Sequence, residues 1–274
     1  TPPETLATDV PLGMSSIQTI VAERIDAVQE EIGRIIVSDF GMIKEVNECL
    51  LSMKGKLFRP TLVLLANEVG EEPSEDAVTL GALVELVHLA TLVHDDAVDH
   101  SVLRRGLPTV NALWTHQVAV IMGDYLYSRS VSELVRMKKY LALSVLANAA
   151  NQMSIGEMRQ LTSVDALEFS EEDYSRLIEC KTASLISAAC EIGSLDGATQ
   201  HSQSLADFGH NLGMAFQIAD DLLDYRGKEE ITGKPSGQDL RERKVTLPLV
   251  ASLSRMSKVE LRETKKFFTL AQPT

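Results

Sequence analysis

Three aspartates, Asp95, Asp96 and Asp99, stand at the end of a mostly apolar stretch that has the composition of a buried helix. Residues four apart lie one turn above each other on a helix, so this spacing predicts carboxylates along one edge. Like charges so close repel each other unless a cation lies among them. Carboxylate oxygens with room for water suit Mg²⁺, which commonly takes substrate phosphate oxygens as its remaining ligands.

The same spacing recurs at Asp220, Asp221 and Asp224, again after an apolar stretch with a helical pattern. A single triplet of this kind has an ordinary alternative as a solvated helix face. Two triplets at the ends of buried helices make that alternative much weaker. We therefore predict two facing carboxylate triplets that hold several Mg²⁺ ions around a diphosphate.

Composition limits the classes of protein to which the chain can belong. Its 274 residues are 45% hydrophobic and 24% charged, which is enough for one large globular domain or two small ones, with an ample core. The formal net charge of −13 argues against a nucleic-acid partner, whose phosphates would be repelled. No apolar run of about 18 residues is free of charge, so we expect no membrane span. The three cysteines lack metal-site spacing and fit a reducing compartment: the cytoplasm, or a plastid or the mitochondrial matrix if a transit peptide was removed.

Helical periodicity dominates the sequence from Ile17 onward. No proline interrupts the chain between Pro108 and Pro235, and strand-like alternation is rare there. We therefore expect an all-α fold in a single domain over residues 17–274, after a flexible lead-in at residues 1–16. Three local signals predict helix boundaries: Ser74 as an N-cap, Gly106 with Pro108 as the end of the first aspartate helix, and Ser170 with Asp173 as a capping pair.

Basic side chains lie close to both triplets in the sequence. Arg104 and Arg105 follow the first triplet, whereas Lys234 and Lys244 follow the second. Each one alone is more often a solvated surface charge than a ligand. Their proximity to the triplets favours a role in binding, because arginine binds phosphate in a bidentate way and lysine supplies a point charge.

The chain resembles the trans-isoprenyl diphosphate synthases, or polyprenyl synthetases, over nearly its whole length. The resemblance rests on KGKLFRP at 54–60, ELVHLATLVHDDAVD at 85–99, LRRGLPT at 103–109, GEMRQL at 156–161, KTASL at 181–185, FQIADDLLDY at 216–225 and GKPSGQDLRERKVTLPL at 233–249. It implies an antiparallel helix bundle around a deep central cavity, and a homodimer. Members of the family continue through further helices, so we expect this chain to lack the last ones. Lys54 and Leu57 stand where the family has a glycine and a basic residue.

The resemblance also implies a role for each candidate residue. Magnesium, as three ions when diphosphate is bound, would be held by Asp95, Asp96, Asp99, Asp220 and Asp224, while Asp221 completes the second motif. The allylic diphosphate would be bound by Arg104, Lys181 and Lys244. Isopentenyl diphosphate would be bound by Lys56, Arg59, His88 and Arg105. Thr182 and Gln217 would line the reacting end, and Lys234 would contact the leaving diphosphate. For His88 the ordinary alternative is a histidine packed in the core.

We therefore expect a Mg²⁺-dependent prenyltransferase that ionises an allylic diphosphate and joins the cation to isopentenyl diphosphate, with loss of a proton. Positions one or more turns before the first triplet would face the growing product, and none of them is aromatic: Val84, Val87, Ala90 and Thr91. A product longer than farnesyl is expected. The alternatives are a geranylgeranyl diphosphate synthase, a non-catalytic regulatory subunit of a heteromeric synthase, and a terpene cyclase that would not need Lys56, Arg59 and Arg105.

Overall fold

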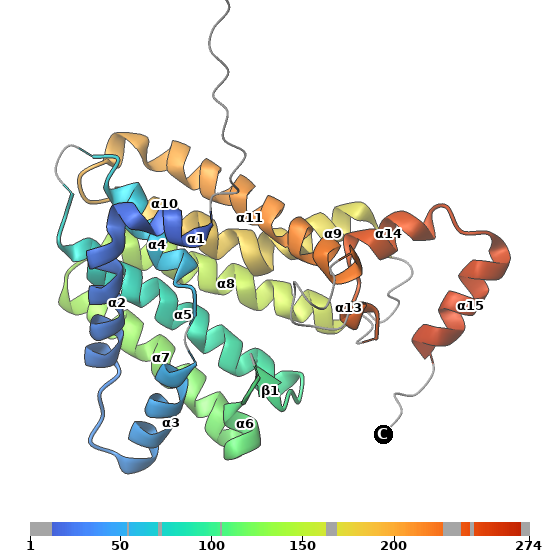
Figure 1. Ribbon diagram of the computed structural model, residues 1–274, viewed down its shortest axis with the longest axis horizontal. Coiled ribbons are helices and arrows are strands. Elements are labelled where there is room, and N and C mark those ends of the chain that lie inside the picture. Colours follow the sequence, from blue (N-terminus) through green and yellow to red (C-terminus); the bar gives the residue numbers. More distant parts are fainter. Residues whose placement is uncertain are drawn as a thin grey trace, which may run out of the picture. The chain divides into compact units, whose positions relative to one another are not determined.

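The computed structural model describes residues 13–53, 55–70, 73–104, 106–162, 169–226, 237–241 and 244–269. In this part of the chain nearly all regular structure is helical, with one two-stranded hairpin (Figure 1). The prediction of an all-α fold is therefore confirmed. The chain divides into two compact units, Thr1–Tyr140 with Gly193–Thr199, and Leu141–Ile192 with Gln200–Thr274. The predicted domain limits and the central cavity stay predictions.

The first unit is organised around its long helix α5. Its elements are α1 (Met14–Gln18), η1 (Thr19–Val21), α2 (Ala22–Ile35), α3 (Gly41–Ser52), α4 (Phe58–Asn67), α5 (Asp76–Val98), β1 (Leu103–Arg104), β2 (Leu107–Pro108), α6 (Val110–Leu113) and α7 (His116–Arg136). α5 packs against α7, α4 and α2 (Figure 1). Most of its apolar positions are buried, because they have neighbours on several sides.

Helix α5 is also long and apolar enough, by length and composition alone, to cross a membrane. Within the protein, 56% of that apolar window is buried. Core packing therefore accounts for its composition, as expected for a helix surrounded by α2, α4 and α7.

The second unit is formed by helices that pack around α11. Its elements are α8 (Tyr140–Thr162) from Leu141 onward, α9 (Glu171–Ile178), the π-helical segment η2 (Glu179–Ala183), α10 (Ser184–Ser194) as far as Ile192, η3 (Thr199–His201) from Gln200 onward, α11 (Ser202–Arg226), α13 (Gln238–Arg241), α14 (Leu247–Leu253) and α15 (Lys258–Thr269). A buried cluster of Tyr174, Ile178 and Val250 joins α9 to α14, and Met214 and Ile218 of α11 pack against it.

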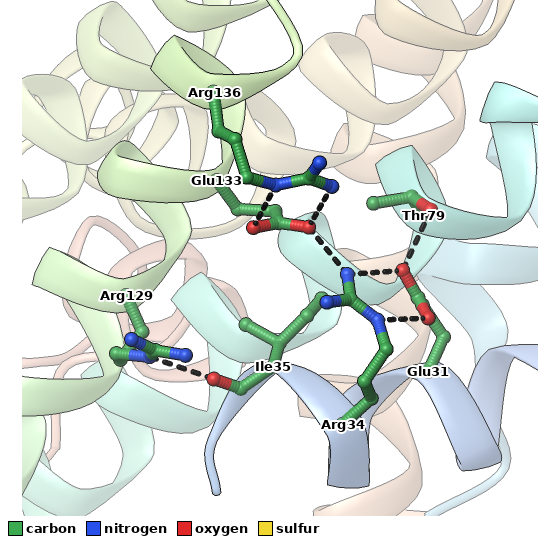
Figure 2. A network of polar contacts seen from close by, with 7 residues as sticks. All are labelled: Glu31, Arg34, Ile35, Thr79, Arg129, Glu133 and Arg136. Atoms are coloured by element: carbon green, nitrogen blue, oxygen red, sulfur yellow. Dashed lines mark hydrogen bonds and ion pairs between the residues drawn. The ribbon is translucent and has the colours of Figure 1, made fainter.

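A network of charged side chains joins three helices of the first unit (Figure 2). Glu133 of α7 is 7% exposed and accepts hydrogen bonds from Arg136, at 2.6 and 2.9 Å, and from Arg34 of α2. Arg34 also binds Glu31, which accepts a bond of 2.7 Å from Thr79 of α5. The bonds from Arg136 and Arg34 lower the pKa of Glu133 to about 2, against the effect of burial. The carboxylate is therefore fully charged near neutral pH.

The predicted helix boundaries have mixed outcomes. Ser170 and Asp173 form a capping box, in which the hydroxyl of Ser170 accepts from the Asp173 N–H at 3.1 Å and the carboxylate of Asp173 accepts from the Ser170 N–H at 3.1 Å. That prediction is confirmed. Ser74 accepts a bond from the Asp76 N–H at 3.2 Å, but the residue in the cap position is Glu75. α1 begins at Met14, three residues before the predicted start of the helical pattern.

The predicted end of the first aspartate helix is wrong. α5 ends at Val98, and the chain then turns through His100, whose φ is 53°. Leu103 and Arg104 pair with Pro108 and Leu107 in an antiparallel hairpin. Gly106 has a φ of 78°, which tight hairpin turns require, so this glycine belongs to a β-turn and not to a helix end. Strands of two residues are too short to show alternation in the sequence.

Candidate active site

The first aspartate motif lies at the end of α5, and its three carboxylates differ in environment. Asp96 is 6% exposed, and both of its oxygens accept hydrogen bonds from Arg104 at 2.8 Å. Asp95 is half-buried and Asp99 is exposed. Arg104 reaches Asp96 because the β1–β2 hairpin folds back toward the helix end. Burial acts to lower the pKa of Arg104, but the bond to Asp96 and the charges of Asp95 and Asp99 outweigh it and raise that pKa.

The positions that precede this motif belong to the packed part of α5. Val84, Val87 and Ala90 are buried, while Thr91 is half-buried and donates its hydroxyl to the His88 carbonyl at 2.7 Å. His88 is half-buried too. Their predicted contacts with a growing product and with isopentenyl diphosphate stay predictions.

Residues near the start of α4 carry two further candidates, Lys56 and Arg59. Lys56 is exposed, and its carbonyl accepts a bond of 2.9 Å from the side chain of Gln18. Arg59 is half-buried in the first turn of the helix. Between them, Leu57 has a φ of 48°, a left-handed conformation that is uncommon for a branched residue. Two candidates from the sequence, Arg105 and Lys234, lie outside the described residues, as does Lys54, which departs from the family pattern.

The second motif lies near the end of α11 and is built in a similar way. Asp221 is 5% exposed; its Oδ2 accepts from the Tyr174 hydroxyl at 2.6 Å and its Oδ1 accepts from Gln217 Nε2 at 2.8 Å. Burial raises the pKa of Asp221, although these two bonds act in the opposite direction. Asp220 is exposed, and Asp224 is half-buried with a bond of 3.2 Å from the Asp239 N–H.

The segment η2 places Lys181 and Thr182 in the same unit as the second motif. Its π-helical bonding interrupts the run from α9 to α10, and such interruptions are frequent at functional sites. Lys181 is half-buried and forms an ion pair of 2.5 Å with Glu157 and a hydrogen bond of 3.0 Å with Gln160. Thr182 is buried and donates to Gln217 Oε1 at 2.8 Å. Lys244 is half-buried, and its main-chain N–H donates to the Asp239 carbonyl at 2.8 Å.

Three further residues, for which the sequence predicted no role, contact the candidate site residues: Glu157, Gln160 and Tyr174. Glu157 and Gln160 are three residues apart on α8, so a shared face of that helix was visible in the sequence. Nothing in the sequence indicated that this face meets Lys181. Tyr174 has the spacing of an ordinary core residue, and its hydroxyl partner, 47 residues away, became visible only in the structure.

The two motifs therefore share one design. The middle carboxylate of each, Asp96 or Asp221, is buried and hydrogen-bonded, and the two outer carboxylates are more exposed. Among the described residues, no group of three or more acidic, histidine or cysteine side chains is placed to hold a metal by itself. Mg²⁺ does not need such a cage, because it keeps several waters and binds through one or two carboxylates plus substrate phosphates. The exposed oxygen donors of each motif fit that chemistry.

Comparison with known proteins identifies the family. The family model "Polyprenyl synthetase" matches residues 41–272. Heptaprenyl diphosphate synthase component 2 of Geobacillus stearothermophilus is 38% identical over 243 residues, which cover 88% of this chain and 76% of that protein. A decaprenyl diphosphate synthase from Rhodobacter capsulatus has a TM-score of 0.87 at 39% identity, over 93% of this chain and 79% of that one. A Caulobacter crescentus polyprenyl synthase, solved with calcium and isoprenyl diphosphate, has a TM-score of 0.83 at 32% identity, over 93% and 84% of the two chains. The resemblance found in the sequence is confirmed, and the chain belongs to the polyprenyl synthetase family of trans-prenyltransferases.

Proposed function

We propose that this enzyme condenses isopentenyl diphosphate with an allylic diphosphate and makes a polyprenyl diphosphate longer than farnesyl. The observation that carries the proposal is the shared design of the two aspartate motifs. Each combines an anchored middle carboxylate with two more exposed ones, and a basic side chain, Arg104 or Lys181, lies in the same unit.

The outer carboxylates are the groups that we assign to magnesium: Asp95, Asp99, Asp220 and Asp224. We propose three ions when diphosphate is bound. Held by these carboxylates, the ions would supply positive charge to offset the negative charge that grows on the diphosphate as the allylic C–O bond breaks. Asp96 was also predicted as a ligand. Because both of its oxygens bind Arg104, ligation through Asp96 would use the lone pairs that those bonds leave.

Arg104 and Lys181 are held in place for binding an anion. A guanidinium has five N–H groups, and Asp96 accepts from two nitrogens of Arg104, so further donors remain for diphosphate oxygens. An ammonium has three N–H groups, and Glu157 and Gln160 account for two of those of Lys181. We assign its third hydrogen to the allylic diphosphate. Lys244 has the same predicted role, and Lys56, Arg59, His88 and Arg105 remain the candidates for isopentenyl diphosphate.

Product length is the finer part of the proposal. The buried side chains Val84, Val87 and Ala90 are small or aliphatic, so none of them closes off space as an aromatic ring would. Two of the three relatives named above are component 2 of a heptaprenyl diphosphate synthase and a decaprenyl diphosphate synthase. Both observations support a product beyond farnesyl.

The test is incubation of purified protein with Mg²⁺, farnesyl diphosphate and labelled isopentenyl diphosphate, followed by sizing of the dephosphorylated products. Products longer than geranylgeranyl are expected. A stop at geranylgeranyl would keep the enzyme class and refute the role of Val84, Val87 and Ala90 in permitting longer products. Turnover of the allylic diphosphate without isopentenyl diphosphate would instead indicate a cyclase.

We propose a homodimer as the working assembly. α7 exposes Val120 and Ile121, at 46% and 62%, and apolar side chains of this kind are suited to a protein interface. The name of the Geobacillus relative marks it as one component of a synthase, so a different partner chain is the alternative. Light scattering of the purified protein should give twice the chain mass of 30.0 kDa. A monomer that gains activity only with a second chain would support the regulatory-subunit alternative.

A further inference from the structure

Asp221 lies at the centre of a chain of hydrogen bonds within the second unit. The Tyr174 hydroxyl donates to Oδ2 at 2.6 Å, and Gln217 Nε2 donates to Oδ1 at 2.8 Å. The Thr182 hydroxyl in turn donates to Gln217 Oε1 at 2.8 Å. The chain thus runs from the buried cluster around Tyr174 to Thr182, which lies beside Lys181 in η2.

Every bond in this chain points its hydrogen toward Asp221. A carboxylate has no hydrogen to donate, so the amide of Gln217 must present its nitrogen to Asp221 and its oxygen to Thr182. A threonine hydroxyl has a single hydrogen, and that hydrogen is committed to Gln217 Oε1. The oxygens of Thr182 and Gln217 are therefore left with acceptor capacity only.

We propose that Tyr174 and Asp221 are positioning residues that set this direction, so that the oxygens of Thr182 and Gln217 face the allylic cation as acceptors. This inference rests on the proposed function, in which an allylic carbocation forms. Oxygen lone pairs stabilise a growing positive charge, whereas a hydroxyl or amide hydrogen in the same place would repel it. Asp221 then acts through Gln217 and Thr182, and it is not a ligand of the metal.

The hydroxyl of Tyr174 can be tested apart from its ring. The ring packs with Ile178 and Val250, and Tyr174→Phe keeps those contacts while it removes one of the donors to Asp221. Asp221→Asn has nearly the same shape but adds a donor, which allows the amide of Gln217 to reverse. Tyr125→Phe is the matched control, because it removes a hydroxyl that donates to the Ile36 carbonyl at 3.0 Å in the first unit and that has no part in this chain of bonds.

The experiment measures kcat, the KM of each diphosphate and thermal unfolding for these three variants and for the double variant of Tyr174→Phe with Asp221→Asn. We expect kcat to fall about tenfold in Tyr174→Phe and about 100-fold in Asp221→Asn, while both KM values change less than about twofold. The double variant should be no slower than Asp221→Asn alone, because both changes act on one chain of bonds. Tyr125→Phe should keep the kcat of the wild type.

A second readout needs no turnover. Isothermal titration with Mg²⁺ and inorganic diphosphate should give the same affinity for Asp221→Asn as for the wild type, whereas Asp220→Asn should weaken it by about tenfold or more. Weaker binding in Asp221→Asn would make Asp221 a metal ligand and overturn the inference. An active wild type with an equally active Tyr174→Phe would also overturn it and leave the proposed function intact. A wild type that never incorporates isopentenyl diphosphate would refute the proposed function itself.

Discussion

Gly213 of α11 lies so close to η2 that an added methyl group has no room. A Cβ atom at this position would lie 2.5 Å from Cα and 2.9 Å from Cβ of Ala183. Carbon atoms in contact are normally about 3.5–4.0 Å apart, so Gly213→Ala must push α11 and η2 apart by about 1 Å. The nearest atom belongs to the backbone and has no side-chain rotation by which to move away.

This displacement should break the bond between Thr182 and Gln217. Thr182 adjoins Ala183, Gln217 lies one turn beyond Gly213, and their hydrogen bond of 2.8 Å would open to about 3.8 Å, beyond hydrogen-bond range. Because a misplacement of about 1 Å near reacting groups costs about 100-fold in rate, we expect a loss of that size in kcat. Overpacking should lower the free energy of unfolding by about 1–3 kcal/mol, whereas the better helix propensity of alanine should raise it by about 1 kcal/mol. The net loss of about 0–2 kcal/mol should lower Tm by no more than about 8 °C.

The control is Gly33→Ala in α2, where an added Cβ meets nothing within 4 Å. It should raise the free energy of unfolding by about 0.5–1 kcal/mol and leave kcat unchanged, because alanine is the better helix former. Steady-state kinetics and thermal unfolding of both variants make up the assay. If Gly213→Ala keeps kcat within about twofold of the wild type, the close approach of α11 to η2 does not position Thr182 and Gln217.

Three further predictions concern stability and the metal. Glu133→Gln should lower the free energy of unfolding at neutral pH by about 1–2 kcal/mol, because the buried carboxylate loses its charged bonds while Arg34 and Arg136 remain half or more exposed. The pKa of Glu133 is lowered to about 2, so its contribution is complete above the ordinary value of 4.5 and is lost as pH falls through about 2. Thermal unfolding measured at decreasing pH should therefore show a smaller fall in Tm for the variant than for the wild type. Equal slopes of Tm against pH would contradict this prediction. Asn67→Leu should lower the free energy of unfolding, measured with urea, by about 2–4 kcal/mol, because the Gly193 and Asp196 carbonyls and Arg24 lose a buried partner. A loss below about 1 kcal/mol would show that water replaces the amide of Asn67 as that partner. Chelation of divalent ions should stop turnover but shift Tm by less than about 2 °C, because we expect the buried apolar side chains to supply most of the stability. A large fall in Tm would show that the metal supports the fold.

The sequence by itself determined the fold class, the family and the positions of the carboxylates. Helical periodicity and the spacing of Asp95, Asp96 and Asp99 are local properties, because they follow from the repeat of the backbone within a few residues. The segments that carry the family resemblance are local as well. These features could therefore be predicted without knowing any contact between residues that lie far apart in the chain.

Only the tertiary structure decided which carboxylate of each triplet is buried and what holds it. Equal spacing gives no reason to single out Asp96 or Asp221. Asp96 is anchored by Arg104 from a hairpin that the sequence did not show, and Asp221 by Tyr174, which is 47 residues away. Lys181 likewise meets Glu157 and Gln160 of another helix. Burial and hydrogen-bond partners depend on contacts between segments that lie far apart in the chain. The hydrophobic periodicity of a single helix gives no information about those contacts.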